Sequence, residues 1–465
     1  MARDRSVYIG AKLRRMRRDL GLTQAAMAAD LNISASYVAL MERNQRAVTA
    51  DMLLRLAATY KVDLNSLADA SNESHAKRVG AVFDDPLFAD IDFAPSEAED
   101  VAVGYPGVSE ALMRLYAAYQ DGQIALADKG ADAIAKTDPL TDARQFLTAR
   151  QNFFPVIDER AERLSARVSE IGGFAAFLRS AHDLTVRRLP PDVMTGSVRR
   201  LDHHRRELVL ENTLDGASRT FQLCLQIAYL ELTEAINAVV DEADFHTENG
   251  RNLARRAVAN YAAGALMMPY RPFLAAAQAR QYDVEALGRQ FGASFEQTAH
   301  RLTTLQKPGR EGVPFFFMRV DAAGNISKRL DGAGFPFARH GGSCPLWSVH
   351  HAFQSPRKII TQWVELPDGE KFFSIARTVI AGGGAYNAPR VERAVALGCA
   401  QKHAHHLIYA ADNSLSPETA TPIGVTCRLC QRTDCTARAE PPIGRQVLKD
   451  DFRRTAAPFE FADDL

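Results

Sequence analysis

The sequence predicts a multidomain, mainly α protein that opens with a small helical domain and closes with an α+β domain. Three observations support this fold class. The chain has 465 residues, more than one ordinary hydrophobic core accommodates. Apolar residues recur at helical spacing through most of 106–310. From Gly312 onward, short apolar runs with Gly and Asn turns replace that period. We therefore expect four segments: 1–70, 71–105, 106–310 and 311–465.

The composition excludes several classes of protein. Hydrophobic residues make up 46% of the chain and charged residues 24%, as in folded globular proteins. No apolar run approaches the roughly 20 residues needed to cross a bilayer, and the basic start lacks the apolar segment of a secretory signal. We therefore expect a cytoplasmic protein that does not enter a membrane. The six cysteines are clustered, which favours metal ligands in a reducing compartment over a disulfide scaffold.

Residues 1–70 predict a five-helix domain that contains a helix-turn-helix. Seven basic residues stand against one acid among the first 18 residues, and such a patch suits phosphate. A first helix ends at Gly21, after which Thr23 can cap "TQAAMAADL" and Ser34 can cap "SASYVALMER". Asn32 supplies the turn between them. Two short helices joined in this way place the second helix in the DNA major groove.

The stretch "LTQAAMAADLNISASYVALMERNQRAVTADMLLRLA" resembles the Xre/Cro-type helix-turn-helix. The resemblance implies that Gln24 holds a phosphate and that Glu42 braces the domain. It also implies that the small residues at the start of the second helix face base edges, so thymine methyl groups and DNA shape would carry much of the specificity. The alternative is a helix-turn-helix that contacts only protein. The predicted DNA-binding residues are Gln24, Ser34, Ala35, Ser36, Tyr37, Ala39, Leu40, Arg43, Asn44 and Arg46.

The middle of the chain begins with an expected linker. Residues 71–105 are polar, contain two prolines and show no periodicity. Residues 106–310 then predict helix almost throughout, because "SEALMRLYAAYQDGQIAL", "GGFAAFLRSAHDL" and two later segments carry apolar stripes of helical period. The histidines of this region are spaced unlike metal ligands on one helix face. We therefore expect an α-helical domain without a metal.

Two of these helical segments, "FQLCLQIAYLEL" and "ANYAAGALMMP", resemble a metallopeptidase group whose helix reads F-x-L-x-H-E-x-x-H. In such a zincin the two histidines bind Zn²⁺ and the glutamate activates water. The matching positions here are Leu225, Gln226 and Tyr229, and the Arg255–Arg256 pair replaces an expected acid. We therefore expect a scaffold without peptidase activity, and no enzyme. Tyr229 and Gln226 could serve a ligand, or be ordinary helix residues.

The C-terminal third predicts a small sheet. "VPFFFMRVDAAGNISKRL" and "KIITQWVELPDGEKFFSIARTVI" are expected hairpins, and "CPLWSVHHAF" between them is expected to be helical. This is the layout of a sensor domain of PAS or GAF kind. Rings and cations together suit an organic anion, although aromatic residues in strands are usually core. The predicted ligand-binding residues are Phe337, Arg339, Trp347 and His350, with Tyr229 from the middle of the chain.

Three cysteines lie within the nine residues "CRLCQRTDC". Cys427 and Cys430 have the C-x₂-C spacing that lets both sulfurs reach one ion, Cys435 follows, and Cys399 is expected as the fourth ligand. Cys344 or His403 could replace it. Four thiolates suit either Zn²⁺ or a [4Fe-4S] cluster, and spacing does not separate the two. The alternative is free reactive thiols. We expect Cys224, on an apolar helix stripe, to be core.

The runs "FPFARHGGSCPLW", "ITQWVELPDGEKFFSIART" and "PIGVTCRLCQRTDCTARAEPP" resemble the C-terminal domain of the short-chain fatty acyl-CoA regulator family. The resemblance implies a homo-oligomeric transcription factor, dimeric or larger, that binds an operator in double-stranded DNA. It implies control of propionate- or glyoxylate-type genes, a short-chain acyl-CoA as effector, and in some members an iron–sulfur cluster. Two alternatives remain: a redox or iron sensor whose cluster is the signal, and a peptidase acting on a repressor.

Overall fold

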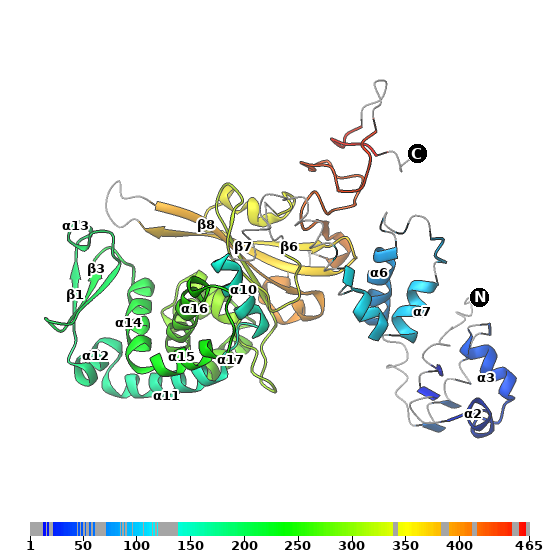
Figure 1. Ribbon diagram of the computed structural model, residues 1–465, viewed down its shortest axis with the longest axis horizontal. Coiled ribbons are helices and arrows are strands. Elements are labelled where there is room, and N and C mark those ends of the chain that lie inside the picture. The colour runs from blue at the N-terminus through cyan, green and yellow to red at the C-terminus, as the bar shows by residue number, and fades with distance from the viewer. Residues whose placement is uncertain are drawn as a thin grey trace.

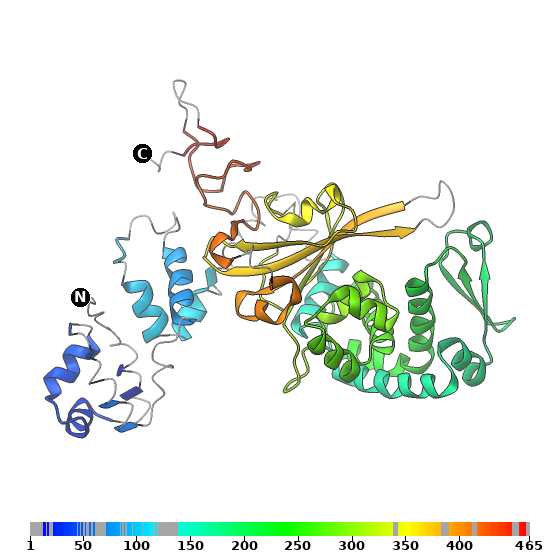
Figure 2. The same cartoon turned by 180° about the vertical axis from the view of Figure 1, so that it is seen from behind.

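The computed structural model describes residues 138–337, 343–382, 390–411, 416–448 and 455–461, together with parts of 13–60 and 71–119. The molecule is elongated (Figure 1). Two short N-terminal helices, α2 (Gln24–Asp30) and α3 (Ala35–Glu42), lie at one end, and a helical body lies at the other. A sheet lies between them, and the C-terminal segment projects away from it (Figure 2).

The segment predicted as a linker contains two helices, α6 (Ser71–Phe83) and α7 (Glu97–Gly104), which its sequence did not reveal. Val79 and Val82 of α6 are fully buried, and the two helices contact each other. Acidic residues fill the first turn of α7, where they suit the positive end of the helix dipole. Each helix has only a few apolar residues, too few to show a helical period in this polar sequence. Two short helices can share so few apolar residues where they contact each other.

The helical body is built around α16 (Glu248–Met267), which contacts α10, α11, α14, α15 and α19. Small residues such as Ala254, Ala259 and Ala262 are completely buried on it, and they let neighbouring helices approach closely. Thr247 caps its first turn. The other helices of the body are α10 (Pro139–Ala149), α11 (Pro155–Ile171), α12 (Phe174–His182), α14 (Gly216–Glu231), α15 (Thr233–Asp241), α17 (Tyr270–Ala279), α18 (Val284–Phe291) and α19 (Phe295–Leu302).

A three-stranded sheet interrupts this body, so the expectation of helix almost throughout 106–310 was wrong. Its order is β1-β3-β2, with β1 (Thr185–Leu189) parallel and β2 (Arg199–Asp202) antiparallel to β3 (Glu207–Glu211). The short helix α13 (Pro191–Met194) connects β1 to β2. Only the central strand has a continuous buried run. The outer strands are short and rich in arginine, and for this reason their apolar alternation is weak.

The C-terminal sheet has six strands in the order β5-β4-β8-β7-β6-β9. Both expected hairpins are confirmed: β4 (Phe316–Val320) pairs with β5 (Ile326–Leu330), and β6 (Ile360–Glu365) pairs with β7 (Lys371–Gly382). The expected helix between them forms two 3₁₀ turns, η2 (Ser348–His350) and η3 (Ala352–Gln354). A PAS or GAF kinship stays a prediction.

Two strands were not expected, β8 (Arg390–Ala400) and the short β9 (Thr421–Pro422). The first is a central strand, because it pairs with both β4 and β7. Three further 3₁₀ turns follow it: η4 (Gln401–His406), η5 (Ile408–Ala410) and η6 (Pro417–Thr419).

Both faces of the six-stranded sheet are buried, but against different partners. Phe315, Phe317 and Phe373 belong to the same core cluster as the helices of the body. Their neighbours Phe316 and Phe372 point to the opposite face, where Trp347 and Phe335 cover them. Successive residues of a strand point to opposite faces, so the helical body and the sheet share one continuous core.

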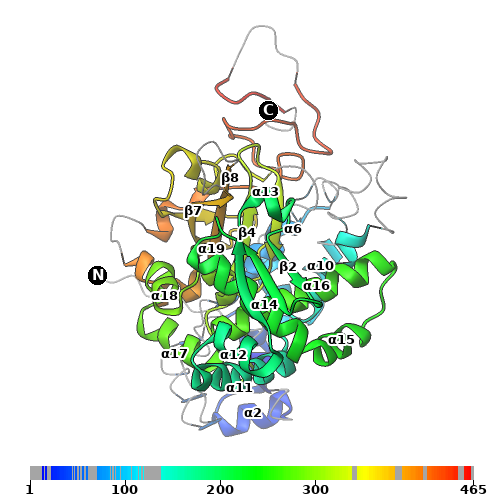
Figure 3. The same ribbon diagram turned by 90° about the vertical axis from the view of Figure 1, so that its left-hand side faces the viewer.

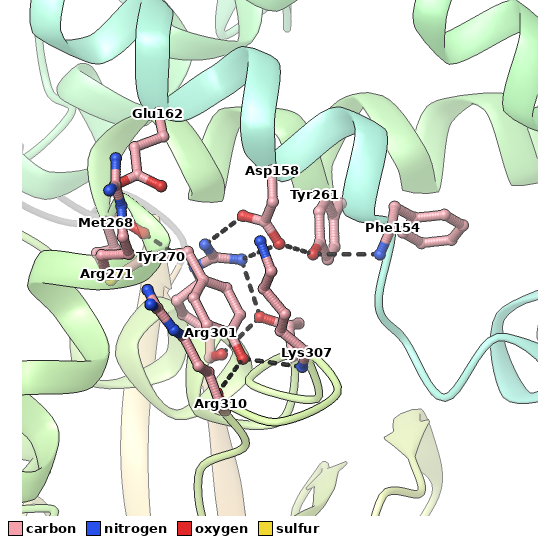
Figure 4. Close-up of polar contacts among 11 residues, drawn as sticks. Phe154, Asp158, Glu162, Tyr261, Met268, Tyr270, Arg271, Arg301, Lys307 and Arg310 are labelled. Atoms are coloured by element: carbon pink, nitrogen blue, oxygen red, sulfur yellow. Dashed lines mark hydrogen bonds and ion pairs between the residues drawn. The ribbon is translucent and has the colours of Figure 1, made fainter.

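A buried ion pair joins three helices of the body (Figure 4). Arg301 of α19 donates to Asp158 of α11 with an Nη2–Oδ1 distance of 2.5 Å, and to the carbonyl oxygen of Met268 at 3.0 Å. The hydroxyl of Tyr261 on α16 donates to the same carboxylate. Burial lowers the pKa of Arg301, but the charges of Asp158 and Tyr261 and the hydrogen bonds to both together raise the pKa overall.

Among the described helices, no single one is long and apolar enough to span a membrane. Helices α14 and α15 meet the criteria of length and composition only when taken together, and the chain bends by 76° where they join.

Candidate functional site

The N-terminal helices present one exposed face. Thr23 caps α2 by accepting from the backbone N–H of Ala26, and Ser34 caps α3 by accepting from that of Tyr37. Asn32 has φ 54°, the left-handed conformation expected for the turn. On α3, Val38 and Met41 are buried. The opposite face carries the predicted base-reading side chains, of which Ala35, Ser36 and Leu40 are exposed and Ala39 is half-buried. Arg43, predicted to lie by the DNA backbone, is also exposed.

Glu42 braces this unit from inside, as the sequence predicts. Its carboxylate accepts from Arg17 Nε at 2.6 Å and from Gln24 Nε2 at 2.7 Å. Burial raises the pKa of Glu42, but hydrogen bonds from Arg17 and Gln24 outweigh it and lower the pKa overall. Gln24, the predicted phosphate ligand, therefore donates one amide N–H to Glu42, and its second N–H remains available for a DNA phosphate.

The remaining predicted DNA contacts lie at the two ends of the recognition helix. The guanidinium of Arg46 lies 5.1 Å from the centre of the Tyr37 ring, and the Ser34 and Ser36 hydroxyls are 3.0 Å apart. Asn44 lies outside the described residues, as does part of the expected five-helix set. The described helices thus support the helix-turn-helix itself, while the five-helix count stays a prediction.

The positions that a zincin would use for metal lie on α14. Leu225 and Gln226 are buried, and the ring of Tyr229 is only partly covered. Two arginines face that ring: the guanidinium carbon of Arg199 lies 5.3 Å and that of Arg255 5.8 Å from its centre. Arg199 comes from β2 and Arg255 from α16. The site that binds a cation in the peptidase pattern therefore carries two cations here, which we call the Tyr229 arginine pair.

Arg199 of this pair lacks a full set of partners. Its Nη1 atom is buried and has no hydrogen-bond partner among the described residues, whereas Arg255 Nε donates to Asn237 at 2.8 Å. Burial lowers the pKa of Arg199. In register Arg199 pairs with Leu210, a fully buried residue of the core that also contains α14 residues, so both side chains lie on the same face of the small sheet. Figure 3 shows β2 of this sheet near α14. An anion between the two arginines would supply the missing acceptor.

Four cysteines line one small cavity of the C-terminal segment. They are Cys427, Cys430 and Cys435, which the sequence predicts together, and Cys344, which enters from the loop before η2. Burial raises the pKa of Cys344, and the nearby Cys430 and Cys427 contribute to the same rise. Gly424 leaves room for them, because a Cβ there would lie 2.8 Å from the Cys430 sulfur.

Cys399 does not join this group. It lies on β8, opposite Phe373 in register, and is fully buried in the core shared with the helices. Burial raises its pKa to about 12, so it favours the thiol form. His403, the other alternative, lines a separate cavity of about 430 Å³ with Tyr282 and Gln281. Of the three candidates for a fourth ligand, only Cys344, which the sequence offered as an alternative, lines the cavity of the other three cysteines.

The donor chemistry of this group fits a thiophilic metal. Within the described part of the chain, no three His, Cys, Asp or Glu side chains already form a metal-binding arrangement.

The other predicted ligand residues have different surroundings. Trp347 is 1% exposed and donates to Ser374 Oγ at 3.1 Å, and Phe337 packs on the core of the sheet's outer face. His350 lies 2.8 Å from the hydroxyl of Ser343, and Arg339 lies outside the described residues. Of the predicted ligand residues, Trp347 and Phe337 thus serve as core, whereas Tyr229 lies beside Arg199, whose Nη1 has no hydrogen-bond partner among the described residues.

A helix-turn-helix unit joined to a helical body and a C-terminal sheet is typical of a multidomain DNA-binding transcriptional regulator. Three family models match it: helix-turn-helix over 13–67, the IrrE N-terminal-like peptidase domain over 179–303, and the C-terminal domain of the short-chain fatty acyl coenzyme A regulators over 304–459. The chain belongs to the short-chain fatty acyl-CoA regulator family.

Full-length relatives support this membership. The chain is 38% identical to a propionyl-CoA carboxylase regulator of Cereibacter sphaeroides, over 98% of this chain and 99% of that one. It is 36% identical to the regulators RamB and PrpR of Mycobacterium tuberculosis, over 97% of this chain and 98% and 95% of theirs. A solved Mycobacterium tuberculosis transcriptional regulator superposes with a TM-score of 0.65 at 37% identity, covering 70% of this chain and 99% of that one.

Proposed function

We propose that this protein regulates genes of short-chain acyl-CoA metabolism, of the propionate or glyoxylate type, and that a short-chain acyl-CoA is its effector. The family description and the name of the Cereibacter relative support the metabolic assignment. The exposed face of α3 supports binding to an operator in double-stranded DNA. We place the protein in the cytoplasm as a homodimer or larger homo-oligomer, because two helix-turn-helix units read two half-sites of one operator.

The effector site that we propose is the Tyr229 arginine pair. The observation that carries it is the buried Arg199 Nη1 without a hydrogen-bond partner. Coenzyme A carries phosphate groups, and a guanidinium matches phosphate by charge and by its fork of donors. Arg255 faces the same ring, so a phosphate or carboxylate oxygen between the two would be held from both sides.

Titration calorimetry with acetyl-, propionyl- and butyryl-CoA tests this proposal. We expect at least one of them to bind, and we expect Arg199→Met to weaken that binding about tenfold or more. Arg200→Met is the matched control, because Arg200 is the next residue of β2, is exposed and points to the other face. If no acyl-CoA binds, the effector assignment fails. If Arg199→Met binds as the wild type does, only the location fails.

We propose that the peptidase-like domain has no proteolytic activity. Neither Leu225 nor Gln226 can take the part of a zinc-binding histidine or a water-activating glutamate, and Tyr229 replaces the second histidine. Incubation of the purified chain with Zn²⁺ and an unfolded protein substrate should leave the substrate intact. Zinc-dependent cleavage that disappears in Tyr229→Phe would revive the peptidase alternative.

We further propose that Cys344, Cys427, Cys430 and Cys435 hold a metal, either Zn²⁺ or a [4Fe-4S] cluster. Bound metal would link the loop before η2 to the C-terminal segment. Anaerobic purification followed by analysis of zinc, iron and sulfide decides between the two. Cys430→Ser should release the metal, whereas Cys399→Ser should retain it. In the iron- or redox-sensor alternative, loss of the cluster on oxidation would also abolish operator binding.

A further inference from the structure

Arg438 is a buried arginine within the cysteine loop. Arg438 is only 4% exposed. An arginine is rarely buried to this extent without a partner of opposite charge. Its described hydrogen bonds all go to backbone carbonyl oxygens. Nη1 donates to Cys427 at 2.9 Å and Nη2 to Cys430 at 2.9 Å. Nη2 also donates to the carbonyl of Arg432, and Nη1 reaches that of Glu440 at 3.4 Å.

These contacts fix the backbone on which the sulfur atoms are mounted. The guanidinium is planar and rigid, so one side chain sets the directions of carbonyl groups from both cysteines of the C-x₂-C turn. The next residue adds a direct contact, because the Ala439 N–H donates to Cys427 Sγ at 3.4 Å. Phe461, which is 1% exposed, lies 5.7 Å from the guanidinium and helps to exclude water.

The charge of Arg438 also suits this place. Its Nε atom is buried and has no hydrogen-bond partner among the described residues. Arg438 shares with the four cysteines the lining of one cavity. Four thiolates around a divalent ion leave a net negative charge, and a cation in the lining of the same cavity, in a region of low dielectric, would offset it.

We infer that Arg438 is a positioning residue for the metal: its fork shapes the C-x₂-C turn, and its charge offsets the thiolates. This inference rests on the metal site proposed above. Arg438 itself would bind no metal. It would hold the loop in the conformation that the metal requires, as residues of the outer shell of metal sites commonly do.

Two substitutions separate the fork from the charge. Arg438→Lys keeps the charge and loses the fork, and Arg438→Met loses both. Arg428→Met is the matched control, since Arg428 is an exposed arginine between Cys427 and Cys430. The full chain would be stripped of metal and titrated with Co²⁺, following the sulfur-to-cobalt charge-transfer absorbance, and affinity would be measured by competition with a chelator.

We expect the affinity for Co²⁺ to fall about tenfold in Arg438→Lys and about a hundredfold in Arg438→Met, with a weakened charge-transfer band and with Arg428→Met unchanged. Wild-type affinity and spectrum in Arg438→Met would overturn the inference, and equal losses in both variants would overturn the part assigned to charge. A wild-type chain that takes up no Co²⁺ would instead overturn the metal site, and the role of Arg438 with it.

Discussion

Glu42 shows how a single carboxylate can hold a DNA-reading unit together. It is 3% exposed and binds Arg17 and Gln24, which come from the two helical segments before α3. Its pKa in the folded chain is lower than in the unfolded chain. Its contribution is therefore present at neutral pH, and it is lost as the pH falls through the ordinary range of a glutamate, about 4.3, and below it.

We predict that Glu42→Gln destabilises the helix-turn-helix by about 1–3 kcal/mol at neutral pH, because it removes a buried charged acceptor from two partly buried donors. Thermal unfolding between pH 7 and pH 3 checks this. The difference from the wild type should shrink at low pH, where the wild-type carboxylate also becomes protonated. Glu99→Gln, an exposed substitution on α7, is the control. A difference that does not depend on pH would contradict the prediction.

At the residue scale, the sequence predicted the helix caps and the turn, because these depend on residues close by in the chain. Thr23, Asn32 and Ser34 act on residues two to four positions away, and the structure places all three as predicted. Cys344 is 83 positions before Cys427 and meets it only because the sheet brings them together. Cys399 looked suitable by its distance along the chain, but an unrecognised strand carries it into the core.

At the scale of elements, the buried ion pair between α11 and α19 offers a sharp test of packing. Asp158 and Arg301 satisfy each other, and both are almost fully buried. We predict that Asp158→Leu or Arg301→Met alone costs about 3–5 kcal/mol, because each leaves an uncompensated buried partner. The double variant Asp158→Leu with Arg301→Met should cost clearly less than the sum of the two. Urea unfolding of the four proteins gives the coupling, and additive losses would refute it.

The central strand β8 gives a second test. A Cβ added to Gly398 would lie 2.3 Å from the ring of Phe316 on β4 and 2.7 Å from the carbonyl oxygen of Phe373 on β7. We predict that Gly398→Ala destabilises the protein by about 1–3 kcal/mol through overpacking. Gly264→Ala is the control, because that helical position meets nothing within 4 Å and should gain up to about 1 kcal/mol. Denaturation midpoints check both.

The elements that sequence reasoning missed share one property: their apolar pattern is incomplete. β1 and β2 carry arginines where a half-buried strand would carry apolar residues, and α6 and α7 bury only a few side chains each. β8 is apolar at its second half, but the arginines and glutamate at its start hide the alternation. The two hairpins were predictable because their turns have a strong local signal.

The Tyr229 arginine pair was half predictable for a similar reason. The resemblance to the peptidase helix points to Tyr229, and it points to Arg255 only as the replacement of an acid. Arg199 lies 30 positions before Tyr229 on an unexpected strand. No pattern within a single helix or strand could have connected the three residues, since the contact depends on how the small sheet packs against α14.

At the scale of the whole molecule, one described ion pair connects the N-terminal half to the C-terminal sheet. Arg78 Nε of α6 lies 3.4 Å from Asp368 Oδ2, in the turn between β6 and β7. Both side chains are about a third exposed, so we expect the pair to add less than about 1 kcal/mol to stability. Its position between the DNA-reading end and the sheet makes it a natural coupling contact.

We predict that Arg78→Gln leaves the affinity for acyl-CoA unchanged but reduces the effect of acyl-CoA on operator affinity severalfold. Acyl-CoA changes operator affinity only through contacts that differ between the acyl-CoA-bound and the free conformation of the protein. We expect the Arg78–Asp368 ion pair to be such a contact. Operator binding with and without the effector, measured by fluorescence anisotropy, checks this. Lys307→Gln, which breaks a surface pair with Glu159, is the control. Equal responses in the wild type and Arg78→Gln would exclude the contact from signalling.

The shared core has a practical consequence for anyone dividing this chain. The two family models meet between residues 303 and 304, and that junction looks like a safe place to cut. Yet Phe315, Phe317 and Phe373 reach across it into the helices. A fragment that begins near residue 304 would expose one apolar face of its sheet to water, and we expect it to aggregate. The recombinant unit to express therefore starts near residue 138 and runs to the C-terminus.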